Sequence, residues 1–274
     1  MAYPLTPELS WLWGGLACFG AGALAAWGGV WSRRTDSRLV LYSLLAAVAL
    51  LAMAIAVRWS RTGEGPFLTL FEVLISNLFS LGLIYALAFW RVPLVRPGAL
   101  LVLPVLFLLS VWTLTVSPEP GRLPATYNSI WLWIHVGVGK LFLGTCLVAV
   151  GLAGTLLLRQ AGRARILFED LPAPAGLDVV AWRFMAIAFV FHSLMLIAGA
   201  VWAQDAWGRY WAWDPLETWA FVTWLALGIS LHIRLTYSLP LWAGWSMILA
   251  VFVLAFLTFF GVPFSSLAPH KGVM

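Results

Sequence analysis

The hydrophobic positions of this chain fall into eight long apolar runs separated by mostly short polar stretches. The runs cover residues 9–31, 38–57, 67–90, 98–116, 130–158, 182–203, 217–236 and 240–262. Most reach about 20 residues, the length with which an α-helix crosses a bilayer. The pattern predicts an all-α polytopic membrane protein with about eight transmembrane helices. We expect one transmembrane domain over residues 1–274 and no soluble domain. The third run has a polar start, with Glu72, Ser76 and Asn77.

The basic residues divide unevenly between the two sides of these predicted helices. One side has ten of the sixteen: Arg33, Arg34, Arg38, Arg91, Arg96, Arg159, Arg163, Arg165, Arg183 and Arg234. The other has six: Arg58, Arg61, Arg122, Lys140, Arg209 and Lys271. Because cytoplasmic loops carry an excess of Lys and Arg, the first side is predicted to face the cytoplasm. Both termini and the stretch between the sixth and seventh runs then face outward.

The composition agrees with a membrane protein and excludes several other classes. Hydrophobic residues make up 62% of the chain and charged residues 10%, whereas soluble domains carry about 25% charged residues. The net charge of +5 comes from dispersed arginines, which indicates topology and not a nucleic-acid surface. Cys18 and Cys146 form no CxxC or metal-ligand spacing, and the absence of CxxCH excludes a c-type cytochrome. No basic region precedes the first run, so no cleavable signal peptide is expected.

One outward stretch is unusually rich in aromatic residues. Residues 201–219 contain five tryptophans, one tyrosine, three acids and one arginine. This density indicates a wall against a flat apolar molecule more than a membrane anchor. Within it, Asp214 is expected to accept hydrogen bonds that fix the loop, and Glu217 to cap the seventh helix from its first turn.

Two of the four histidines share the predicted outer side with this stretch. His135 lies near the start of the fifth run and His270 follows the eighth. Two imidazoles beside an aromatic wall suit a haem with two axial histidine ligands. For each histidine alone, simple hydration at the interface is the alternative.

The other two histidines lie inside the predicted membrane spans. Counted at 1.5 Å per residue, His192 is about 16 Å and His232 about 22 Å below the outer surface. Because ionisable groups inside a membrane are costly, each is a candidate functional residue. The alternatives are a hydrogen bond to a neighbouring helix for His192 and an interfacial position beside Arg234 for His232. The two depths differ by about 6 Å, and nothing in the sequence requires the two histidines to bind one iron.

The aromatic stretch carries a family resemblance. Its pattern WAxxAWGxYWxWDPxETW over residues 202–219 resembles the WWD signature of haem-handling membrane proteins of cytochrome c biogenesis. With the LHIR segment at 231–234, it is most similar to the CcsA (ResC) family, a subunit of the System II cytochrome c synthase. Arg58-Trp59, the GPFL segment at 65–68 and Glu72 also resemble an outer loop of that family.

The resemblance implies a set of haem b ligands and contacts. His135 and His270 match the family's two external axial ligands of the haem iron. His232 matches the histidine of an intramembrane haem site whose other ligand comes from the partner subunit CcsB (ResB). His192 stands where relatives commonly have a small residue or proline, so its role is open and includes replacing that ligand. The segment that holds the haem comprises Trp202, Trp207, Tyr210, Trp211, Trp213, Asp214 and Glu217.

The resemblance also implies an activity of holocytochrome c synthase (haem lyase) type, together with CcsB. Two cysteine thiols of an apocytochrome c CxxCH motif add to the two haem vinyl groups, and a thioredoxin-like reductant acts indirectly. No residue suggests a thiol-activating base, so no acid or base is assigned. Arg209, Arg122 and Lys271 are outward cations that either pair with haem propionates or remain solvated. The implied location is the bacterial plasma membrane with its active face outward, or the thylakoid membrane in a plastid.

Three other functions are considered. A haem-delivery protein of the CcmC type shares the WWD motif without attaching haem, but such proteins have six helices. A b-type electron-transfer cytochrome usually pairs histidines at matched depths, unlike His192 and His232. A transporter with an interfacial aromatic belt does not account for five tryptophans and two outward histidines gathered on one side.

Overall fold

The computed structural model describes residues 6–32, 36–63, 65–122, 127–160, 168–169 and 171–261. Within these ranges it has eight helices that are long and apolar enough to cross a membrane, and no strand. The prediction of an all-α membrane protein with eight spans is confirmed. The elements are α1 (Pro7–Ser32), α2 (Ser37–Thr62), α3 (Leu70–Arg91), η1 (Pro93–Gly98), α4 (Ala99–Thr113), α5 (Ile130–Gln160), α7 (Pro174–Trp207), α8 (Pro215–Thr236), α9 (Leu241–Phe256) and the π-helical turn η3 (Leu257–Gly261).

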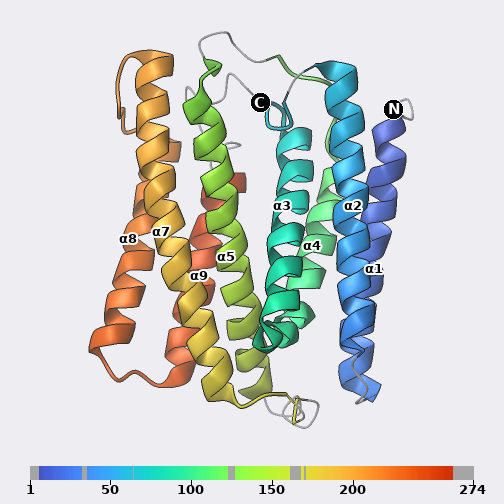
Figure 1. Cartoon of the computed structure of the whole chain (residues 1–274). Helices are drawn as coiled ribbons and strands as arrows, with labels where there is room; N and C mark the ends of the chain where they lie inside the picture. Colours follow the sequence, from blue (N-terminus) through green and yellow to red (C-terminus); the bar gives the residue numbers. More distant parts are fainter. Residues whose placement is uncertain are drawn as a thin grey trace.

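The helices stand side by side in a bundle with α5 near its centre (Figure 1). Helices α1 to α4 form one side of the bundle and α7 to α9 the other. Helix α5 packs against α3, α4, α7 and α9, and it is the most buried of the eight spans. Side chains of α5 therefore pack against helices from both sides of the bundle.

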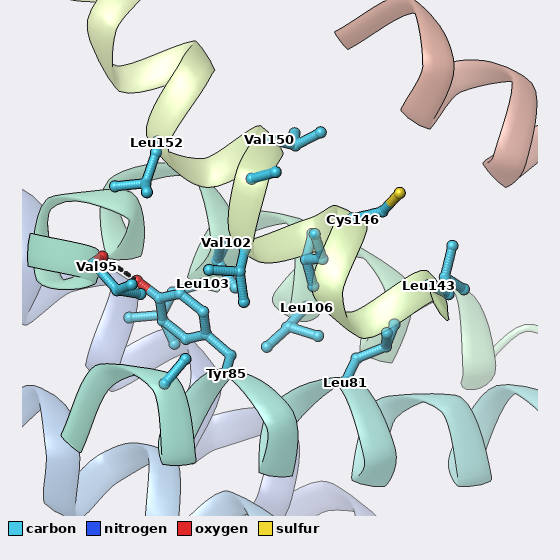
Figure 2. Close-up of a cluster of buried hydrophobic side chains, with 14 of the residues drawn as sticks. Leu81, Tyr85, Val95, Val102, Leu103, Leu106, Leu143, Cys146, Val150 and Leu152 are labelled. Carbon is cyan, nitrogen blue, oxygen red and sulfur yellow. Dashed lines mark hydrogen bonds between the residues drawn. The ribbon is translucent and has the colours of Figure 1, made fainter. Parts of the chain in front are cut away.

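Close packing joins α3, α4 and α5. Figure 2 shows Tyr85 of α3 among aliphatic side chains of α4 and α5, with Leu106 and Cys146 nearby. The Tyr85 hydroxyl donates a hydrogen bond to the Val95 carbonyl oxygen at 3.2 Å. A Cβ on Gly98 would lie 3.2 Å from the carbonyl carbon of Gly151, so two backbones approach closely here. Such contacts hold membrane helices together because lipid offers little hydrophobic driving force between them.

The polar start of α3 is explained by its cap. Thr69 accepts a hydrogen bond from the Glu72 N–H at 3.3 Å, and the Glu72 carboxylate accepts one from the Thr69 N–H at 3.2 Å. This reciprocal capping box satisfies donors that the first helical turn leaves unpaired. The helix therefore begins at Leu70, slightly later than the predicted 67.

A buried ionic cluster joins α2 to α1 and α3. The Arg58 guanidinium lies 3.2 Å from Glu8 and 2.8 Å from Glu72, and it also donates to the carbonyl oxygens of Pro118 and Glu119. Because one buried cation has several partners, its charge is compensated. The cluster fixes the ends of three helices.

Helix α7 begins at Pro174, well before the predicted residue 182. Proline is tolerated in a first helical turn, and the polar Asp178 does not end the helix because it has partners on α8 and α9. Its carboxylate pairs with Arg234 and accepts a hydrogen bond from Trp245 Nε1 at 2.8 Å. With 34 residues, α7 is about 51 Å long and extends beyond a hydrocarbon core of about 30 Å.

The described arginines of the two predicted sets lie at opposite ends of the bundle. We call the end at which α7 stops and α8 starts the aromatic end; it is the upper end in Figure 1. Arg58, Arg61 and Arg209 lie at this end, whereas Arg91, Arg159 and Arg234 lie at the other. That the aromatic end faces outward stays a prediction.

Candidate functional site

A cavity of about 260 Å³ lies at the aromatic end between α3, α5, α7, α8 and η3. Its walls are mainly apolar and include Phe67, Leu132, Val136, Met195, Trp202, Trp211 and Phe259. Its polar groups include Ser76, Asn77, His135, Lys140 and Glu217. An apolar cavity with a few polar groups is typical of small-molecule sites, whose volumes are about 300–1,000 Å³. This volume is slightly below that range.

His135 is held in this cavity by α7. Its Nδ1 lies 2.9 Å from the Met195 carbonyl oxygen. Because a carbonyl oxygen can only accept, Nδ1 carries the hydrogen, and the Nε2 of a neutral ring then has the lone pair. The ring also stacks beside Trp202, with centroids 6.0 Å apart and planes 18° apart. A backbone carbonyl that fixes the tautomer in this way is typical of histidines that bind metals.

The contact between His135 and α7 depends on a glycine. A Cβ on Gly199 would lie 2.7 Å from His135 Nδ1 and 2.8 Å from Cε1. Since Cβ atoms essentially never approach other atoms this closely, any side chain at position 199 would displace the imidazole. Gly199 therefore positions His135.

The loop before α8 is fixed by the two acids singled out in the sequence. Asp214 accepts a hydrogen bond from the Glu217 N–H at 2.9 Å. The Glu217 carboxylate accepts from the N–H groups of Ala212 at 2.7 Å and Asp214 at 3.4 Å. The expected cap is present, as a complete capping box. Trp213, between Ala212 and Asp214, has φ 57°. This left-handed conformation is strained for a bulky side chain.

The structure divides the aromatic residues of this region into three groups. Trp202, Tyr210 and Trp211 line the cavity. Trp207 lies behind them, with its ring 5.0 Å from that of Trp202. Trp213 is 67% exposed, and its ring meets the edge of Trp211 at 5.6 Å. The Trp211 indole N–H is buried and has no hydrogen-bond partner within the part of the chain that the structure describes.

A polar cluster beside α3 also lines the cavity, although the sequence did not lead us to assign it to the site. Lys140 Nζ donates to Ser76 Oγ at 2.8 Å and lies 3.3 Å from Asn77 Oδ1. The sequence predicts Lys140 only as an outer-side charge, and Ser76 and Asn77 only as part of the polar start of the third run. A lysine inside an apolar run, five positions after His135, is a signal that could have identified it. No sequence signal identifies Gly199 or Met195.

His192 and His232 lie in different surroundings, one buried and one exposed. His192 is 1% exposed and stacks on Phe142 with ring centroids 4.0 Å apart. Neither of its ring nitrogens has a hydrogen-bond partner among residues 6–261 as far as they are described. His232 is exposed on the surface of α8. His270 lies outside the described residues, so its pairing with His135 stays a prediction.

Comparison with known proteins identifies the family. The model of a family described as "Cytochrome C assembly protein" matches residues 39–270. The chain belongs to the cytochrome c assembly protein family. This agrees with the resemblance found in residues 202–219.

Curated relatives in this family are named cytochrome c biogenesis protein CcsA. The protein from Prochlorococcus marinus (strain AS9601) is 27% identical over 89% of this chain and 87% of its own length. The Synechococcus sp. (strain RCC307) protein is 28% identical, over 94% and 93%. The Chlamydomonas reinhardtii protein is 31% identical over 68% of this chain, and the match spans 55% of the algal protein.

A solved structure named cytochrome c heme lyase CcmF shares the fold. It superposes with a TM-score of 0.70 and 20% identity over 95% of this chain, which corresponds to 48% of that protein. The chain thus has the fold of about half of that structure.

Proposed function

We propose that this chain acts in cytochrome c biogenesis by binding haem b in the cavity at the aromatic end. It would present the haem there for attachment to the CxxCH motif of an apocytochrome c. The observation that carries the proposal is the geometry of His135: the Met195 carbonyl fixes the hydrogen on Nδ1, which places on Nε2 the lone pair that an iron ligand needs. Family membership and the aromatic walls of the cavity support it.

The second axial ligand of the proposed outer haem is His270. Support comes from η3, the last described element before that residue, because Thr258 and Phe259 of this turn line the same cavity as His135. Thr258 also lies 3.0 Å, Oγ to Oγ, from Thr223 of α8, which holds the turn beside the cavity.

The proposed chemistry is the addition of two thiols to two vinyl groups. In each addition the sulfur forms a bond to one vinyl carbon and the thiol hydrogen ends on the other, so the step needs no net oxidant or reductant. We assign no acid or base to this chain. Its contribution is to hold the haem edge where the thiols arrive, which makes the reaction effectively unimolecular. The indole walls of Trp202 and Trp211 keep water away from the macrocycle.

The cavity is small enough to leave part of a bound haem outside, which suits a haem that is transferred to another protein. A volume of about 260 Å³ takes part of the macrocycle and leaves an edge outside. Tyr210 lines the cavity and is 61% exposed, so its ring is accessible to that edge. An exposed edge is what attachment to a polypeptide requires.

The proposed partner is the membrane subunit CcsB. His232 is exposed on α8 inside a predicted span, and an imidazole facing lipid is costly unless another group covers it. We assign His232 to an intramembrane haem whose second ligand comes from CcsB. If His192 supplied that ligand instead, it would have to leave its stack with Phe142.

The test is a haem spectrum and an attachment assay on the complex with CcsB in a bacterial membrane. We expect His135→Ala and His270→Ala each to lower haem occupancy, to change the axial-ligand bands and to abolish attachment to a CxxCH reporter. Unchanged occupancy and bands in both variants would overturn the outer haem site. Normal haem binding by the wild-type complex without attachment would support haem delivery alone.

A further inference from the structure

The cavity is lined by a lysine that forms no ion pair within the described residues. Lys140 is the one lysine or arginine among the described lining residues. Its Nζ contacts two neutral oxygens, Ser76 Oγ at 2.8 Å and Asn77 Oδ1 at 3.3 Å. No carboxylate in the described ranges lies within 4.0 Å of it. An ammonium group has three donor hydrogens, so one remains after these two contacts.

Among the described residues, the buried Arg58 and Asp178 each have an ion-pair partner. Arg58 has Glu8 and Glu72, and Asp178 has Arg234. A charge inside a membrane protein is costly when it has no partner. Lys140 differs from these groups because its partners are neutral and because it lines a cavity, where a ligand can supply the missing negative charge.

Lys140 and His135 are placed to contact one ligand. Both are on α5, and both line the same cavity. Five residues separate them, so Lys140 is about 7.5 Å deeper along the helix axis. If His135 holds the iron of a haem, the edge of the haem that lies deeper in the bundle is therefore on the side of Lys140. Haem b carries its two propionates on two neighbouring pyrrole rings, along one edge, and its vinyl groups on the other two pyrrole rings.

We propose that Lys140, oriented by Ser76 and Asn77, binds a haem propionate carboxylate. The haem then enters with its propionate edge toward the membrane interior and its vinyl edge toward the aromatic end, where an apocytochrome arrives. This inference rests on the proposed function and adds the orientation of the haem to it. A charge-assisted hydrogen bond inside a cavity is stronger than one in water. The outward Arg122 and Arg209 are exposed, and exposed ion pairs contribute little.

The experiment compares haem b with its dimethyl ester, which lacks both carboxylates. Each is titrated into the full chain with its partner subunit, purified without haem, and binding is followed by absorption. Removal of a hydrogen bond to a charged group lowers affinity by about 10- to 100-fold. We therefore expect the wild type to bind haem b about 10- to 100-fold more tightly than the ester. Lys140→Met should lose that preference, and Lys140→Arg should retain part of it.

Substitutions of other cations test whether the preference belongs to Lys140. Arg91→Met makes a comparable change at the opposite end of the bundle and should leave both affinities unchanged. If Arg122→Met or Arg209→Met abolishes the preference while Lys140→Met retains it, the propionates face outward and the proposal is overturned. The proposal also falls if Lys140→Met weakens haem b and ester equally, because the lysine then binds something other than a propionate, such as a lipid phosphate.

The outcomes separate this inference from the proposed function. If the wild type binds neither haem b nor the ester, the haem site itself is refuted. If it binds both equally, the haem site stands and the propionate assignment is wrong. This wild-type comparison needs no substitution, so it can refute the propionate assignment even if Lys140→Met does not fold, and Lys140→Arg then tests whether the preference belongs to the lysine.

Discussion

His135 Nδ1 lies 2.9 Å from the carbonyl oxygen of Met195, so a side chain of α5 is oriented by the backbone of α7. The two residues lie 60 positions apart in the sequence, and their helices form an extensive contact in the bundle. The imidazole reaches the α7 backbone because position 199 has no side chain. This relationship gives the site its most direct test.

Gly199→Ala should displace His135 without removing any candidate ligand. We expect haem affinity to fall by about 10- to 100-fold, the usual effect of losing a group that orients a metal ligand. The measurement is haem titration of the purified complex. Gly137→Ala is the matched control, because a Cβ there would meet nothing within 4 Å. Equal effects of the two substitutions would contradict the positioning role of Gly199.

Trp213→Gly should weaken haem attachment without lowering thermal stability. Glycine adopts φ 57° without the strain that a bulky side chain incurs, about 1–3 kcal/mol. Because the Trp213 ring is largely exposed, little packing is lost. We expect unchanged or raised thermal stability together with weaker haem attachment to a CxxCH reporter. A large loss of stability would show instead that the ring is structural.

Asp178→Asn should destabilise the chain at the end opposite to the proposed site. Breaking a buried ion pair costs about 3–5 kcal/mol. We expect about 2 kcal/mol here, because the Arg234 side chain is 31% exposed and solvent screens the pair. Thermal unfolding in detergent measures this, with Asp36→Asn as the control, since asparagine also caps a helix well. Haem affinity of the folded protein should not change.

His192→Phe should leave the intramembrane haem in place, whereas His232→Phe should remove it. The first preserves the ring stack on Phe142 and removes two buried nitrogens without described partners. Unpaired buried polar groups cost about 1–3 kcal/mol each, so stability should rise or stay the same, and the intramembrane haem spectrum should persist. The second should abolish that spectrum. Loss of the spectrum in His192→Phe would identify His192 as the ligand.

The helices were predictable because bilayer thickness fixes the length of an apolar span. The starts of α3 and α7 were less predictable. The start of α3 depends on the Thr69–Glu72 cap, and that of α7 on partners of Asp178 that lie on other helices. The aromatic loop was singled out by a long and rare pattern, and His135 by its predicted place on the same side of the membrane. Lys140 was not assigned to a cavity, because its partner Ser76 is on α3, 64 positions away. Contacts between distant helices leave little trace in sequence spacing.

The capping box before α8 also determines the electrostatic field in the cavity. Glu217 is the one acidic residue among the described lining residues, and a bare carboxylate there would repel an anionic ligand. Its Oε2 instead accepts two backbone N–H groups, and it lies at the positive end of the α8 dipole. These hydrogen bonds and the dipole offset part of its negative charge. The residues that shape the loop therefore also weaken the repulsion between Glu217 and an anionic ligand beside Lys140.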